Sequence, residues 1–503
     1  MLSPHLPPPP ATHVTTGPVI GRVTDTSAVV MLEVSTPAKI TCVACVVSKQ
    51  YPQGRPVAHS TVTLPAGRPR SFLLTGLVPG HSHVVVFSGV NEADARARVG
   101  RFRTIGPGKP NLRLVAVAGD RPDAVGVAEY NLWEHLHEEV DANRIDVMLH
   151  VGCQVNLAPA FRDAWLALRQ QEEAGLLLPG SARAAEAAEA AEEALRRVYR
   201  QSWNLPHTRE ALAGCSHIMM WSDDDVCPAF GDGGSGLVPE EALAVGPTPA
   251  PGPTALQIML RAAQQVYREY QRQLFDPHGH GFPGMGGAAG TAGLYAATYD
   301  QLQADRRDLL HAAQGKDEEA TKAWAAAQDA ADQADARAAV AAALDARSAA
   351  HAKGVALLEL AEVNGEQHWH RLGDAGILAL DMRSSRVLPD GTPAPDNSLF
   401  GNRQLRMVKQ ALTDPDINFM VVVSEWGLVD GAAATAPGTA FGGSPAWQAG
   451  VGGGRTTHRW TEEDVWRARR AQRGADAGDA LRMLRGLAEW KAAKPGRQVL
   501  MLT

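Results

Sequence analysis

Cysteine is scarce in this sequence, with five residues among 503. An odd and sparse set in a chain of this length does not suit a disulfide framework and favours a reducing compartment. Cys42 and Cys45 have the spacing of half a zinc site, but no second Cys/His pair follows at a suitable distance, and their segment alternates like a strand. We therefore expect structural cysteines there rather than metal ligands.

Long apolar runs are also missing. No stretch approaches the roughly 18 apolar residues that a bilayer span requires. The start of the chain, with four consecutive prolines at Pro7 to Pro10, lacks the basic and apolar segments of a secretory signal. The sequence therefore predicts a cytoplasmic protein without a membrane span, and a disordered Pro-rich segment over residues 1–17.

An excess of positive charge is the third absence. Lys and Arg number 48 against 55 Asp and Glu, which gives a formal net charge of -7. The densest basic cluster, Arg467 to Arg470, is of the short kind that usually forms a solvated helix face. We expect no nucleic-acid partner, because nothing here attracts phosphate backbones over a distance.

The composition itself suits a globular protein of two domains, since 45% of 503 residues are hydrophobic. Between residues 18 and 104, turn residues separate short β-branched runs at regular spacing, which is typical of an antiparallel sandwich. Leu77-Val78-Pro79-Gly80, followed by the strand-like run 84–87, resembles the Leu-x-Pro-Gly turn of fibronectin type III domains. Two glycines and two prolines in residues 104–110 indicate the linker that ends this domain.

After residue 111 the pattern changes to buried strands and helices. Apolar runs at 112–118 and 145–151 flank a helical pattern at 129–139, which indicates a βαβ unit. Four more buried strands are predicted at 217–221, 375–380, 419–423 and 498–502. Polar residues follow most of these runs, and ligands of α/β sheets bind at the carboxyl ends of strands.

Four segments interrupt this pattern. Residues 182–194 are rich in Ala and Glu and strongly helical, whereas 231–253 and 279–293 are rich in Gly or Pro and indicate loops. Residues 306–353 have high helix propensity but few large apolar side chains to bury. We expect the last segment to be an insertion of solvent-exposed helices.

The order of several motifs is similar to that of one enzyme family. The motifs are Ala118-Gly119-Asp120-Arg121, His150-Val151-Gly152-Cys153, Tyr199-Arg200, Trp221-Ser222-Asp223-Asp224-Asp225, Leu380-Asp381-Met382-Arg383, Gln404 and Ser424-Glu425. From Pro18 onward the chain resembles the PhoD-like (alkaline phosphatase D) branch of the metallophosphatases. The resemblance implies an α/β (α+β) metallophosphatase-like layered sheet with helices on both faces over residues 111–503, preceded by the fibronectin type III-like β-sandwich of residues 18–104.

The chain departs from that family's pattern where metals are held. Gly119 stands where the family has a cysteine, and Cys153 and Asn156 stand where it has the carboxylate and phenol of Gly-Asp-x-x-Tyr. Asp224 replaces a histidine that assists phosphate chemistry. The strand 498–502 precedes the place of the family's Gly-Asp-Val-His motif, so we expect a domain that is incomplete at its C-terminus.

The resemblance also assigns the candidate site residues. The metal ligands are Asp120, Cys153, Asp223 and Asp225, the catalytic residues are Asp224 and Arg121, and the substrate contacts are Arg383 and Glu425. In an active enzyme of this kind two divalent or trivalent metal ions clamp the reacting oxygens. With these replacements we expect no cofactor or only a partial set.

Other interpretations of these residues remain open. Cys153 fits a small buried thiol better than a nucleophile, because no partnered histidine is evident. The acidic run 223–225 fits a helix cap or turn as well as a metal site, and Asp381 with Arg383 fits a structural ion pair. His368 and His370 have ligand-like spacing, but we expect them at the surface because they precede a buried strand.

These departures favour a pseudophosphatase that acts as a binding or structural subunit with protein partners. The alternative is an active metal-dependent phosphoesterase, hydrolysing phosphomonoesters or phosphodiesters, with a remodelled site. A third hypothesis is a protein that binds a phosphorylated small molecule through Arg121 and Arg383 without hydrolysing it.

Overall fold

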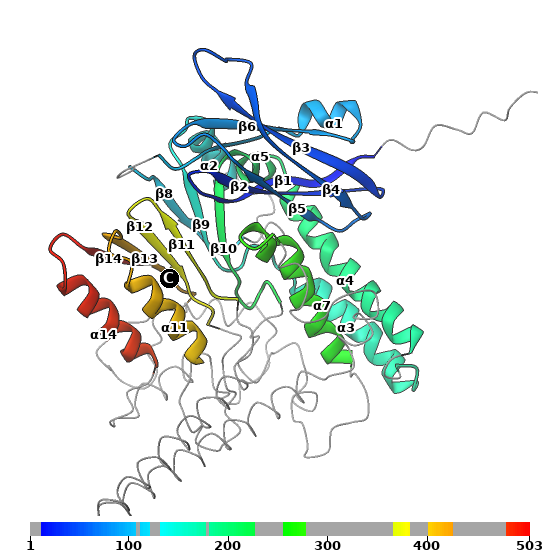
Figure 1. Ribbon diagram of the computed structural model, residues 1–503. Helices are drawn as coiled ribbons and strands as arrows, with labels where there is room; N and C mark the ends of the chain where they lie inside the picture. Colours follow the sequence, from blue (N-terminus) through cyan, green and yellow to red (C-terminus); the bar gives the residue numbers. More distant parts are fainter. Residues whose placement is uncertain are drawn as a thin grey trace, which may run out of the picture.

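The computed structural model describes residues 12–106, 111–120, 131–177, 181–226, 255–277, 366–382, 401–425 and 479–502. They form a mixed α/β protein with a β-sandwich, two further sheets and several helices. Figure 1 shows the sandwich at one end of the molecule, with the other sheets and the helices beneath it. None of the described helices has the length and apolar character needed to cross a membrane.

The predicted antiparallel sandwich is present. One sheet has the strand order β1-β2-β5 and the other β4-β3-β6-β7, and every pair is antiparallel. The strands are β1 (Val14–Val23), β2 (Ser27–Val34), β3 (Ala38–Val47), β4 (Arg55–Leu64), β5 (Arg70–Thr75), β6 (Ser82–Ser88) and β7 (Gly100–Arg103), with helix α1 (Glu92–Ala97) before the last. Strand β1 starts at Val14, so residues 14–17 are part of the sandwich and not of a disordered N-terminal segment.

Alternation along the strands builds the sandwich core. Ile40, Cys42 and Ala44 of β3 point inward and pack with Phe72 from the opposite sheet. Cys45, three residues after Cys42, falls on the other face of the strand and is partly exposed. The two thiols therefore do not face a common ion, which agrees with a structural role.

The remaining strands form two sheets, a division that the sequence patterns did not specify. The first sheet is parallel, with order β10-β9-β8, and the second has order β11-β12-β13-β14, in which only β11 is antiparallel to its neighbour. Their bounds are β8 (Leu114–Val117), β9 (Val147–Val151), β10 (Ser216–Met220), β11 (His368–Leu372), β12 (Ala375–Ala379), β13 (Phe419–Val423) and β14 (Gln498–Leu502).

The two sheets pack face to face. Leu149 and Ile218 of the first sheet share one buried cluster with Ile377 and Val421 of the second. Helices α2 (Leu132–Asp141) and α5 (Thr208–Gly214) lie by the first sheet, whereas α11 (Gly401–Leu412) and α14 (Asp479–Ala492) cover the outer face of the second. In the part of the chain that the structure describes, each sheet thus has helices on one face, while its other face meets the second sheet.

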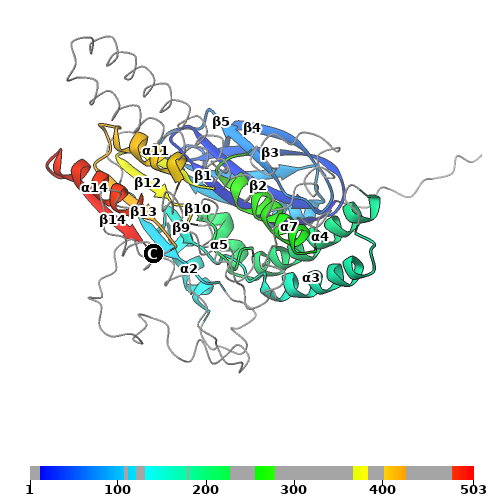
Figure 2. The ribbon, with the colours of Figure 1, turned by 90° about the horizontal axis from the view of Figure 1, so that it is seen from below.

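A further helical layer joins the sandwich to the sheets. It consists of α3 (Ala158–Glu173), α4 (Ala182–Trp203), α7 (Ala255–Tyr270) and the 3-10 turn η1 (Arg272–Leu274). Figure 2 shows α3, α4 and α7 on the side of the molecule away from α11 and α14. Val19 and Met31 of the sandwich belong to the same buried cluster as these helices.

The Ala-rich segment 182–194 is helical, as predicted, but it is not a peripheral insertion. Ala187, Ala188 and Ala191 are buried in the helical layer, where their small side chains allow α3 and α7 to approach α4. Segments 231–253, 279–293 and 306–353 lie outside the described residues.

Candidate functional site

The carboxyl ends of β8, β9 and β10 meet at one edge of the first sheet. Asp120 follows β8 and Cys153 follows β9, and the amide of Asp120 donates to the carbonyl of Cys153 at 2.8 Å. The acidic run 223–225 follows β10, and Glu425 follows β13 of the second sheet. Arg121 and Arg383, the predicted anion contacts, lie outside the described residues.

Gly152 allows the β9 and β10 ends to approach closely. Its φ is +95°, and a β-carbon there would lie 2.5 Å from the β-carbon of Ser222. Cys153 also has a positive φ, +54°, which residues other than glycine rarely adopt. This turn places the thiol of Cys153 beside the end of β10.

The hydroxyl of Ser222 contacts side chains that follow strands of both sheets at this edge. The Cys153 thiol donates to Ser222 Oγ at 3.3 Å, and Ser222 Oγ in turn lies 2.9 Å from Asp223 Oδ1 and within hydrogen-bonding distance of Glu425 Oε1. A hydroxyl has one proton and donates it to one carboxylate at a time. Ser222 Oγ therefore lies between two acidic side chains and can donate to either.

The Cys153 thiol is held in its protonated form. Burial raises its pKa well above the usual range, and the neighbouring charges of Asp225, Asp223 and Asp224 add to the rise, while the bond to Ser222 opposes it. Because the thiolate is the form that binds metal and attacks substrates, the surroundings of Cys153 oppose both roles.

The carboxylate of Asp225 is fully buried and closes the loops after β9 and β10. It accepts hydrogen bonds from the amides of Gln154 at 3.0 Å, Val155 at 3.3 Å and Ser222 at 3.0 Å, and from Gln271 Nε2 at 3.1 Å. Burial raises the pKa of Asp225 to about 8, against the effect of these donors. Of the two interpretations of the acidic run, the contacts of Asp225 are those of a residue that closes a turn.

The carboxylate of Asp381 has a similar structural role at the end of β12. It accepts from the indole of Trp221 at 3.1 Å and from the amide of Glu366 at 2.6 Å. Gln404 of α11 makes two hydrogen bonds with the Asp381 backbone, at 2.7 Å to its amide and 3.1 Å to its carbonyl. These bonds link the second sheet to the first and to α11.

The prediction that His368 and His370 lie at the surface is wrong. Both are buried, because the inner face of β11 packs against β10 and the ring of Phe275. Their rings are 2.6 Å apart at the nearest nitrogens, and His368 Nε2 lies 3.1 Å from the carbonyl of Met219. Burial lowers the pKa of His368 to about 3 and that of His370 well below its usual range.

A second buried histidine pair lies in the first sheet, and the sequence did not indicate it. His150 Nε2 lies 2.9 Å from His217 Nδ1, and burial lowers the pKa of His217 to about 4. Each histidine lies in a short, otherwise apolar strand. Only the alternation of side chains along the two strands could have indicated that the two rings face each other. Both pairs are buried, and burial favours their neutral forms; His150 also lines the cavity at the β8 and β9 ends.

A cavity of about 210 Å³ opens beside the β8 and β9 ends, between them and helices α2 and α5. Its walls combine apolar side chains with a few polar ones, including Trp133, Leu136, Leu212, Asp120, Cys153 and Gln154. The sequence indicated the polar residues through the strand ends but not the helical wall.

Among the described residues, the acids at the strand ends do not form a group of three with ligand atoms within 4.8 Å of one another. The group that does is His137, His207 and Glu210, on α2 and α5. No sequence motif joins these residues, since 70 positions separate the two histidines.

Comparisons with known proteins do not establish a family for this chain. No family model matches the chain, and no curated protein matches it. A solved structure titled "Structure of PhoD" is similar over 84% of this chain and 63% of its own, at 10% identity and a TM-score of 0.44. The chain thus spans less than two thirds of that protein.

Two other solved structures are similar over about one fifth of the chain. The sensor domain of the anti-sigma factor RsgI4 in Pseudobacteroides cellulosolvens matches over 21% of this chain and 99% of its own, at 15% identity and a TM-score of 0.15. A redesigned beta sandwich protein matches over 17% of this chain and 86% of its own, at 21% identity and a TM-score of 0.12. TM-scores this low do not establish a shared fold.

Proposed function

We propose that this chain is a metallophosphatase-like protein that acts as a binding or structural subunit and does not hydrolyse phosphate esters. The observation that carries the proposal is the carboxylate of Asp225, which stands in the predicted metal set but accepts four hydrogen bonds from buried N–H groups. A carboxylate surrounded in this way holds two loops together and has little capacity left for a cation.

The ligand requirements of a two-metal site also support the proposal that the chain does not hydrolyse phosphate esters. Two hard cations require several oxygen ligands that converge on common points. At this edge Cys153 offers a protonated thiol, and Ser222 places a hydroxyl between Asp223 and Glu425. Two predicted ligands, Cys153 and Asp225, are therefore unsuited to hard cations.

The charges that a phosphate substrate would meet also support the proposal. Asp120, Asp223, Asp224 and Glu425 are partly buried and acidic, and their charges oppose the approach of a phosphate unless cations neutralise them. The adjacent cavity has a largely apolar helical wall, which suits an apolar group of a partner better than a phosphate.

One observation favours the alternative, an active phosphoesterase with a remodelled site. Asp223 and Glu425, from different sheets, meet at the hydroxyl of Ser222, and two carboxylates so close together can begin a cation site. The two functions make opposite predictions for metal bound at the strand ends and for turnover.

The test measures metal content and hydrolysis together. The full chain is loaded with Mn²⁺, Fe³⁺ or Ca²⁺, desalted and analysed for bound metal, and then assayed with p-nitrophenyl phosphate and bis-p-nitrophenyl phosphate. We expect no turnover above that of the matched variants Asp223→Asn and Asp163→Asn, the latter at an exposed position on α3. Turnover that Asp223→Asn abolishes and Asp163→Asn preserves would establish the phosphoesterase.

A further inference from the structure

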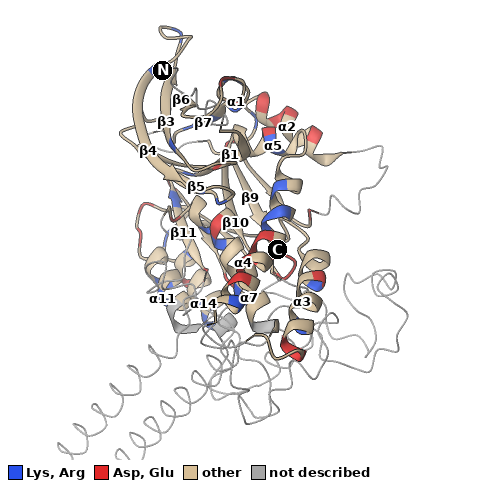
Figure 3. Cartoon of the chain, turned by 90° about the vertical axis from the view of Figure 1, so that its right-hand side faces the viewer, with Lys and Arg blue, Asp and Glu red and all other residues tan. Residues whose placement is uncertain are grey.

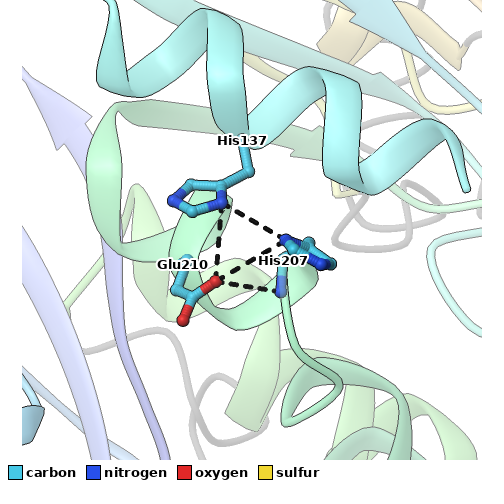
Figure 4. Close-up of side chains that lie close together, drawn as sticks. All are labelled: His137, His207 and Glu210. Atoms are coloured by element: carbon cyan, nitrogen blue, oxygen red, sulfur yellow. Dashed lines mark hydrogen bonds and ion pairs between the residues drawn. The ribbon is translucent and has the colours of Figure 1, made fainter.

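Three possible ligand atoms converge between α2 and the start of α5. Figure 4 shows the side chains of His137, His207 and Glu210 pointing toward one another. The Nδ1 atoms of the two histidines are 3.4 Å apart, and Glu210 Oε2 lies 3.5 Å from His137 Nδ1 and 3.8 Å from His207 Nδ1. Zinc bonds of about 2.0–2.1 Å in a tetrahedron place ligand atoms roughly 3.3 Å apart, close to these separations.

A carboxylate behind His137 supports this arrangement. His137 Nε2 lies 3.2 Å from Oδ2 of Asp141, one helical turn later on α2. A carboxylate at this position accepts a hydrogen bond from Nε2–H and leaves the lone pair of Nδ1 directed into the cluster, as commonly found behind metal-binding histidines. Arg209 donates to the other Glu210 oxygen, Oε1, at 3.1 Å, so Oε2 is the oxygen that faces the histidines.

The backbone of His207 is held in an uncommon conformation. Its φ is +64° and its ψ −48°, a γ-turn in which the amide of Thr208 donates to the carbonyl of Pro206 at 2.7 Å, and its own amide donates to Glu210 Oε2 at 3.1 Å. Glycine would adopt this conformation more readily. The imidazole of His207 takes part with Glu210 in the capping box of α5, and the ring also faces the other two ligand atoms.

We propose that His137, His207 and Glu210 bind one zinc ion through Nδ1, Nδ1 and Oε2. Two nitrogen ligands and one carboxylate form a set that zinc accepts with a fourth position left for water. The three side chains are 22%, 34% and 37% exposed, so the ion and its water reach the site from solvent. The ion links α2 to α5 beside the first sheet and lies apart from the strand-end acids of the proposed function.

The test titrates Zn²⁺ into chelator-treated full-length protein at pH 7.5, in competition with a chromophoric chelator. We expect one ion per chain and a rise in the thermal unfolding midpoint with zinc. His137→Gln and Glu210→Gln each weaken binding at least tenfold and remove the thermal rise. His207→Asn does the same, and asparagine keeps a side chain that can cap the start of α5.

The matched control is His135→Gln, which removes an exposed histidine from the same helix outside the cluster. It binds zinc like the unaltered chain, and so does Asp223→Asn, which separates this site from the strand-end acids. The proposal is overturned if the unaltered chain binds no zinc, or if His137→Gln and His207→Asn bind it equally well. A thiolate-to-metal charge-transfer band after Co²⁺ substitution also overturns it, because that band places the ion at a cysteine.

Discussion

Two fully buried carboxylates, Glu269 in the helical layer and Asp225 at the strand ends, are neutralised in different ways. Arg196 donates to both oxygens of Glu269, at 2.6 and 3.0 Å. Burial alone would raise the pKa of Glu269, but the charge and hydrogen bonds of Arg196 outweigh it, and the pKa is lowered. Asp225 receives uncharged N–H donors, and its pKa is raised to about 8.

The same contrast separates the junction of the sandwich from the candidate site. Glu33 of β2 is buried and accepts from Arg200 Nε at 2.6 Å, from Thr15 Oγ1 at 2.7 Å and from the hydroxyl of Tyr270. Figure 3 shows acidic and basic residues interspersed on α4 and α7, which pack together below the sandwich. Charge pairs therefore fix the sandwich to the helices, whereas neutral donors around Asp225 hold the strand-end loops.

The largest effect is expected from breaking the charge pairing. Arg196→Met removes a close guanidinium group from the buried Glu192 and Glu269 and leaves the more distant Arg68, 3.9 Å from each carboxylate. The free energy of unfolding should fall by about 3–5 kcal/mol, as for other broken buried ion pairs. Urea unfolding at pH 7.5 measures the loss, and Arg169→Met, which breaks an exposed pair with Glu173, should change stability by under about 1 kcal/mol. Equal losses in the two variants would contradict the contrast.

A smaller loss is expected where the partners are neutral. Asp225→Ala leaves several buried N–H donors without an acceptor, and each such group costs about 1–3 kcal/mol if water cannot replace the carboxylate. We expect a total of roughly 2–3 kcal/mol, because the emptied space admits water to some of the donors. Asp163→Ala, at an exposed position of α3, is the control. A metal-free protein as stable with Asp225→Ala as without it would show that Asp225 does not close the loops.

The next effect depends on pH. The pKa of His368 is about 3 in the folded chain, well below its usual value, so its contribution to stability is complete above pH 6.5 and is lost as the pH falls toward 3. Between pH 7 and 5.5 this histidine should account for about 1.3 kcal/mol of lost stability. His368→Gln should reduce the pH dependence by that amount, whereas His13→Gln, at an exposed position, should not. Parallel pH profiles for all three proteins would show that His368 becomes protonated in the fold.

Sequence patterns predicted the strands well and their assembly less well. Apolar runs located β9, β12 and β13 to within a residue or two, because a strand buried on both faces needs a continuous run. The run 498–502 located β14 equally well, although its residues are exposed or only partly buried. The same runs do not encode which sheet a strand joins. Two stacked sheets and one broad sheet bury the same residues, so the division became visible only through tertiary contacts, and with it the burial of His368 and His370.

The candidate site shows a similar limit. The sequence placed the acids at the strand ends, but the direction of each side chain depends on partners elsewhere in the chain. Asp225 turns inward because Gln271, 46 residues later, donates to it, while Asp223 turns toward Ser222. The cluster of His137, His207 and Glu210 depends on the packing of α2 against α5, which no local pattern predicts.

The smallest change in stability is expected at Cys153, where the substitution by serine replaces one neutral hydrogen-bond donor by another. Cys153→Ser keeps a group that donates to Ser222, so we expect a change in unfolding free energy of under about 1 kcal/mol by urea titration. Cys153→Asp is the informative counterpart, because it adds a charge beside Asp223 and Asp225 and should cost more. In the helical layer removing a charge should destabilise the protein, and at the strand ends adding one should do so. If Mn²⁺ restores the stability of Cys153→Asp above that of Cys153→Ser, the other strand-end acids suit a hard cation, and the thiol at position 153 is the group that opposes binding in the unaltered chain.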